Sequence, residues 1–248
     1  MATMEDMMSI TDAMRKTPTK NAPGKSGKRH WGRWIFAGIA VVAILLVGQS
    51  VFLFMTAPTT PPLALSRAAA SAPVGSQDGA WDVAAGSQAG FRATESALGM
   101  SNDAVGRTKN VTGNIAVAGN KVTSATFAID IASIKVDGKT QAQVVTSLDA
   151  QNHPSATVTL TSPMTLSADF KTGGTTTTTV PGQITMRGSS HPVSFKISGR
   201  RDGATLQFAG SAPIAFSDWG IKGPAGSGSF GELADHGVAD FVVVLKRR

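Results

Sequence analysis

Residues 124–132 read SATFAIDIA, and every second residue from Phe127 to Ile131 is large and apolar. Residues 155–161 (SATVTLT) repeat this alternation, with threonines between the apolar positions. A period of two is typical of a strand that buries one face and exposes the other to water. These stretches therefore predict β-strands packed against a common core.

The same alternation continues to the C-terminus. It involves Ile184 and Met186; Val193, Phe195 and Ile197; Leu206 and Phe208; Ile214 and Phe216; and Phe241, Val243 and Leu245. Turn signals separate the runs, among them Asp202-Gly203, a dipeptide typical of tight hairpins because both residues tolerate a positive φ. About eight strands at this spacing predict an all-β, closed or nearly closed antiparallel barrel.

Two segments depart from simple alternation. Residues 139–150 (KTQAQVVTSLDA) place apolar side chains on one helical face, which predicts a short helix with Asp137 as its cap. The run Thr175–Thr179 predicts a polar edge strand or a loop tip.

Composition excludes several classes of protein. The chain of 248 residues has no cysteine, so disulfides, thiol nucleophiles and cysteine-bound metals are absent. The net charge of +7 comes from residues 1–34, with seven basic and three acidic side chains, and from the tail Lys246–Arg248. Because the rest is balanced, no basic face is expected for nucleic acid.

Residues 35–55 (IFAGIAVVAILLVGQSVFLFM) contain no charge over 21 positions. As a helix they would be about 31 Å long, which matches a hydrocarbon core of roughly 30 Å. Basic residues precede this run, so it predicts a single transmembrane helix with a cytoplasmic N-terminus. A cleaved signal peptide is the alternative, with small residues at 68–72 as the cleavage region.

The predicted organisation has four parts, with the protein in the cell membrane and its barrel extracytoplasmic. They are a disordered basic cytoplasmic tail (1–34), the transmembrane helix (35–55), a Pro/Ala/Ser/Thr linker (56–80) and the barrel (81–248).

Motifs for catalysis are missing. His153, His191 and His236 form no HxH or HExxH pattern, and no GxSxG sequence occurs. Residues 226–231 (GSGSFG) match GxGxxG, but no helix has room to follow before the last strand. The sequence predicts a protein that is not an enzyme, with no metal and no cofactor beyond a bound lipid.

Residues 81–247 resemble the YceI-like family of lipocalin-shaped, polyisoprenoid-binding barrels, and particularly its membrane-anchored actinobacterial branch. The stretches that carry the resemblance are Trp81–Val83, Gly90–Arg92, Val105–Thr108, Val111–Gly113, His153–Thr157, Gly182–Gly188, His191–Val193 and Phe216–Ile221. The chain departs from the family at Lys139-Thr140, where an Arg-Asp pair is usual, and at Glu95, where many members have histidine.

The resemblance implies a barrel that holds an isoprenoid quinone or polyprenyl lipid in its apolar interior. The expected ligand-binding residues are Phe91, Phe127, Ile129, Val158, Leu160, Ile184, Met186, Phe195, Phe208, Phe216, Trp219 and Phe241, with Arg107 and Arg187 at the rim for a polar head. A solid core would use the same apolar residues. The alternative is therefore a ligand-free envelope module that binds another protein through loop 220–231 and the threonine run.

Overall fold

The computed structural model describes residues 61–67, 75–97, 100–136, 138–222 and 232–248. The tail 1–34 and the expected transmembrane helix 35–55 lie outside these residues and stay predictions. Within the described ranges, no helix has the length and apolar character needed to cross a membrane.

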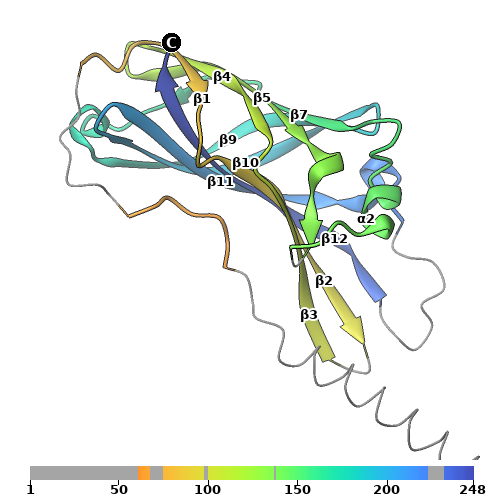
Figure 1. Ribbon diagram of the computed structural model, residues 1–248. Helices are drawn as coiled ribbons and strands as arrows, with labels where there is room; N and C mark the ends of the chain where they lie inside the picture. The colour runs from red at the N-terminus through yellow and green to blue at the C-terminus, as the bar shows by residue number, and fades with distance from the viewer. Residues whose placement is uncertain (1–60, 68–74, 98–99, 137, 223–231) are drawn as a thin grey trace, which may run out of the picture. The chain divides into compact units, whose positions relative to one another are not determined.

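Antiparallel strands make up most of the described chain (Figure 1). The strands are β1 (Gly79–Val83), β2 (Gln88–Ala97), β3 (Met100–Thr108), β4 (Val111–Ala118), β5 (Lys121–Asp130), β6 (Lys135–Val136), β7 (Ser155–Leu160), β8 (Met164–Thr165), β9 (Thr175–Met186), β10 (Ser189–Asp202), β11 (Thr205–Ala215) and β12 (Glu232–Arg247). The short helices are η1 (Ile131–Ser133), α2 (Ala142–Ser147), η2 (Phe170–Thr172) and η3 (Phe216–Trp219).

The sheet closes into a barrel in the order β1-β4-β5-β7-β9-β10-β11-β12, and β12 returns to β1. Trp81 pairs with Arg247 and Val83 with Leu245 at the closing seam. The earlier part of β12 instead pairs with β2, which continues into β3 and β6 as a branch of the sheet. The expected antiparallel barrel of eight strands with one short helix is confirmed.

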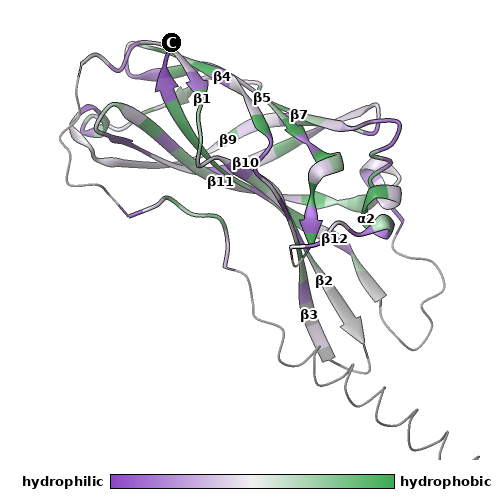
Figure 2. Ribbon diagram, viewed as in Figure 1, coloured by the Kyte–Doolittle hydropathy of each residue, from purple (hydrophilic) through white to green (hydrophobic). Residues whose placement is uncertain are grey.

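The alternation in the sequence becomes the inside and outside of this barrel. On β12, Val243 and Leu245 are fully buried, and Figure 2 shows hydrophobic and hydrophilic positions interleaved along the strands. Phe195 and Trp81 are each only 1% exposed to solvent. Burial of this inner face supplies the main driving force for folding.

Residues 61–67, within the expected linker, lie against the outer face of the barrel. The Leu63 N–H donates to Asp240 Oδ2 at 3.4 Å, and Ser66 Oγ donates to Gln207 Oε1 at 2.6 Å. Arg200 also donates to the Ser66 carbonyl. We call this segment, residues 61–67, the strap.

Two expected elements are shorter or different in the structure. The helix spans Ala142–Ser147 rather than 139–150, because Val136 and Lys139 hydrogen-bond to each other before it and Asp149 has a φ of 51° after it. Its N-cap is Gln141, whereas Asp137 lies outside the described residues. Phe216, expected on a strand, instead opens the 3-10 helix η3.

The threonine run is an edge strand, as one of the two expectations had it. Thr175–Thr179 pair with residues 196–200 of β10, whereas β7 pairs with β9 only at residues 182–185. Residues 223–231 of the expected contact loop and the GxGxxG match at 226–231 lie outside the described residues.

Candidate functional site

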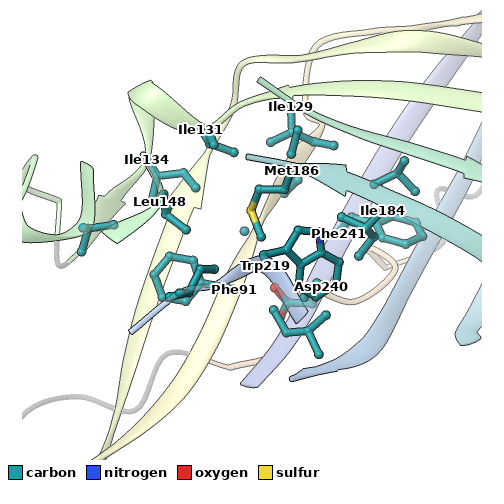
Figure 3. A pocket seen from close by; sticks show the side chains of 18 of the residues that line it. Phe91, Ile129, Ile131, Ile134, Leu148, Ile184, Met186, Trp219, Asp240 and Phe241 are labelled. Atoms are coloured by element: carbon teal, nitrogen blue, oxygen red, sulfur yellow. The ribbon is translucent and has the colours of Figure 1, made fainter. Parts of the chain in front are cut away.

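An apolar cavity of about 190 Å³ lies between the strands and α2 (Figure 3). Among the twelve apolar residues expected from the sequence to bind a ligand, ten line it: Phe91, Phe127, Ile129, Val158, Ile184, Met186, Phe195, Phe216, Trp219 and Phe241. Leu160 and Phe208 instead line a neighbouring cavity of about 30 Å³. The residue alternation therefore located the interior, and the barrel is hollow rather than solidly filled.

Polar groups reach the large cavity mainly from the segment around α2. Gln141, Gln143 and Ser147 line it, together with the apolar Val144 and Leu148. No residue of α2 is fully buried, and α2 makes no ladder hydrogen bonds of the kind that hold the strands. The cavity thus has a strand-built apolar side and a helical side with hydrogen-bonding groups.

Arg187 fastens α2 to the sheet. It lies in the two-residue turn between β9 and β10, with φ of 53° at Arg187 and 76° at Gly188. Its Nη1 donates to the Ser147 carbonyl at the end of α2. Arg187 itself is outside the lining of both cavities.

Arg107 also lies outside the lining and belongs to a cluster of charges around Asp240, whose side chain is fully buried. Its Nη2 is 2.9 Å from Asp240 Oδ2, and Arg92 Nη2 is 3.2 Å from the same oxygen. Arg107 Nη1 also donates to the carbonyls of Phe91 and Gly106, both at 3.0 Å. Burial lowers the pKa of Arg107 from its ordinary value, Asp240 acts in the opposite direction, and Arg92 lowers it further.

Asp240 is the one charged residue in the described lining of the large cavity. Alternation along β12 puts its side chain on the opposite face from Ala239 and Phe241. It pairs across the sheet with Gly90, which pairs in turn with Arg107, so the carboxylate and the guanidinium point to the same face of the sheet. A Cβ at Gly90 would lie 1.9 Å from the Gly106 carbonyl oxygen, so this close backbone approach requires glycine. Asp240 is therefore part of the cavity wall, with its charge neutralised on the outer side.

Trp219 is held at the cavity by contacts from β10. Its Nε1 donates to the Ser189 carbonyl at 3.2 Å, and its ring is packed edge-on against His191 at 5.0 Å between centroids. This arrangement fixes a large aromatic surface at the lining.

The three histidines that the structure describes each have a separate partner. His153 lies 3.8 Å from Asp149 and His236 lies 2.6 Å from Asp235, whereas His191 contacts Trp219. Across the described ranges, no group of three His, Cys, Asp or Glu side chains is placed to hold a metal ion.

Sequence reasoning did not single out the polar lining residues Gln141, Gln143 and Ser147, or the charge of Asp240. On a short amphipathic helix such polar residues are ordinarily expected on the solvent side. An isolated aspartate between two apolar residues of a strand was the only available signal for Asp240.

The fold and cavity define a class, the antiparallel eight-stranded barrels with an apolar pocket between their strands. A barrel of eight strands can hold one small ligand. Residues 81–244 match the YceI-like domain, and the chain belongs to that family.

Two solved structures are similar to the chain. A polyisoprenoid-binding domain from Saccharophagus degradans, implicated in plant cell wall breakdown, is 18% identical with a TM-score of 0.52, and the match covers 69% of this chain and all of that one. BcnA from Burkholderia cenocepacia is 22% identical with a TM-score of 0.46, covering 62% of this chain and 95% of that one. No curated protein matches the sequence.

Proposed function

We propose that this protein binds an isoprenoid lipid, with the chain of an isoprenoid quinone or polyprenyl lipid inside the barrel. The observation that carries this proposal is the cavity of about 190 Å³, whose wall is apolar on the strand side. Family membership and the polyisoprenoid-binding domain from Saccharophagus degradans support the ligand class.

The polar lining favours a neutral head group. Gln141, Gln143 and Ser147 offer amide and hydroxyl groups to a carbonyl or hydroxyl. No lysine or arginine in the described ranges lines either cavity, and a buried anionic head without a cationic partner is costly. A quinone or a free polyprenyl alcohol therefore fits better than a diphosphate.

Arg187 is the proposed contact for any head that reaches past α2, because its guanidinium lies beside the cavity-lining residue Ser147 and makes a single hydrogen bond there. Arg107 is less available to a head group, because its guanidinium already binds Asp240 and two backbone carbonyls.

A long chain needs more space than the cavity offers, because pockets for drug-sized ligands have volumes of roughly 300–1,000 Å³. The side that yields most readily is α2, which is held by Arg187 and lies outside the strand ladder. We propose that the ligand passes into the barrel by displacing α2.

The proposed setting is the outer side of a cell membrane, with residues 35–55 as an uncleaved anchor. The uncharged run of 21 residues and the basic residues before it support this topology. A lipid-binding barrel tethered there would have access to ligands in the bilayer. Binding rather than catalysis is the proposed role, and the cavity weighs against the alternative of a solid interaction module.

Organic extraction of the purified protein followed by mass spectrometry tests the proposal. We expect a co-purifying isoprenoid, or uptake of added ubiquinone measured by quenching of Trp219 fluorescence, because a quinone in the cavity would lie beside that ring. The matched control is Trp219→Phe, which removes this signal and keeps an aromatic wall. A protein that yields no lipid and takes up no quinone would contradict the proposal.

A further inference from the structure

The two cavities of the barrel are neighbours with a shared wall. Five residues line both of them: Phe127, Val158, Phe195, Phe241 and Val243. The small cavity continues beyond this wall among apolar side chains that include Leu160, Met164 and Phe208. An apolar chain that crossed the wall would find a lining of the same chemistry on the other side.

Phe195 and Phe241 are two of the three aromatic residues of this wall, and their rings contact each other. Their ring centroids are 6.0 Å apart at an interplanar angle of 72°, the edge-to-face arrangement that aromatic pairs favour. They come from β10 and β12, which both pair with β11, so their rings meet over the inner face of that strand. We call this pair the aromatic partition.

Glycines on the neighbouring strands hold both rings in place. A Cβ at Gly182 would lie 2.7 Å from Phe195 Cε2, and a Cβ at Gly210 would lie 2.6 Å from Phe241 Cζ. Gly210 is the direct cross-strand partner of Phe241. Each ring therefore packs against bare backbone, and any larger residue at either glycine would force it out of position.

We propose that the aromatic partition sets the length of isoprenoid chain that the barrel accommodates. The chain fills the large cavity from the α2 side and stops at the rings of Phe195 and Phe241. This inference rests on the proposed lipid-binding function and adds to it the residues that select chain length.

Replacing one ring by a smaller apolar side chain joins the two cavities without adding a polar group. Phe241→Leu removes ring volume next to Gly210, and Phe195→Leu does so next to Gly182. The matched control is Phe208→Leu, which makes the same change in a residue that lines only the small cavity.

The experiment measures affinity for a series of ubiquinones that differ only in the number of isoprene units, by Trp219 fluorescence with the full chain. In the parent, affinity should rise by about tenfold or more with each added unit that is buried, then level off when the large cavity is full. In Phe241→Leu and Phe195→Leu the plateau should move to a longer homologue. In Phe208→Leu it should stay at the parental length.

An identical plateau in the parent and both partition variants overturns the proposal while leaving lipid binding intact. A shift of the same size in Phe208→Leu also overturns it, because general loosening would then be the cause. If the parent binds no homologue, the proposed function itself fails. Should either leucine variant not fold, Phe241→Met, which also removes the ring but keeps a long, flexible apolar side chain, must still lengthen the accepted chain for the proposal to stand.

Discussion

Adjacent residues of β12 serve opposite faces of one wall. Phe241 faces the interior, packs edge-on against Phe195 and lines both cavities. Asp240 has no exposed side-chain surface, yet it is paired with Arg92 and Arg107 and receives a hydrogen bond from the strap. The inner face therefore depends on shape and apolar area, and the buried part of the outer face depends on charge neutralisation.

The largest loss of stability is expected when a charged side chain replaces an apolar one on the inner face of the barrel. Phe195→Asp should cost more than about 5 kcal/mol, because it removes a buried ring and buries an unpaired carboxylate. Chemical denaturation and quinone titration should show an unfolded barrel or lost binding. Lys196→Asp, one residue along on the exposed outer face, should change stability by no more than about 0.5 kcal/mol. Similar losses in both variants would contradict the assignment of faces.

The next effect concerns the charge cluster. Asp240→Ala should destabilise the protein by about 3–5 kcal/mol, because Arg92 and Arg107 would keep their charges without the partner. Urea unfolding measures the loss. Combining Asp240→Leu with Arg107→Met should restore part of the stability, since removing both members of a buried pair costs less than removing one. No recovery in the double variant would mean that the carboxylate acts through something other than this pair.

Arg187 tests the helical side of the cavity. Arg187→Ala should lower stability by about 1 kcal/mol and speed ligand exchange, because the guanidinium no longer holds the Ser147 carbonyl. Alanine keeps a side chain at the same positive φ, so backbone strain is matched. Stopped-flow quenching of Trp219 fluorescence gives the exchange rates.

The same variant tests contact with a ligand head group. For a charged-head ligand we expect Arg187→Ala to lose about 1.5–3 kcal/mol of binding free energy, with a neutral quinone almost unaffected. Equal affinities of parent and variant for both ligand types would remove Arg187 from the site.

The smallest expected effect concerns the exposed ion pair between Asp82 and Arg248. Arg248 hydrogen-bonds to both carboxylate oxygens of Asp82 and holds the pKa of that carboxyl below its usual range. A lowered folded-state pKa contributes stability above the unfolded-state pKa, and this contribution disappears as the pH falls through the folded value. NMR titration should show a lowered pKa for Asp82 that returns to normal in Arg248→Ala. Because the pair is exposed, added salt should weaken the shift, unlike the buried contacts of Asp240.

Particular residues show which features of the fold and of the cavity could be predicted from the sequence. The alternation at Phe127 and Ile129 predicted strands, and it also identified residues that line the cavity. It could not show that Leu160 and Phe208 line a second cavity, because the wall between the two cavities is formed by side chains that are far apart in the sequence. The expected helix was found but shortened, since helix ends depend on local hydrogen bonds rather than on periodicity.

The sequence by itself determined the class of fold, because a period of two along many short segments leaves each segment with one face to bury. It also determined which apolar residues form the interior. Only the tertiary structure decided that the interior is hollow, that Phe195 and Phe241 divide it, and that Asp240 meets Arg92 and Arg107. These features arise between residues far apart in the chain, and strand register alone brings them together.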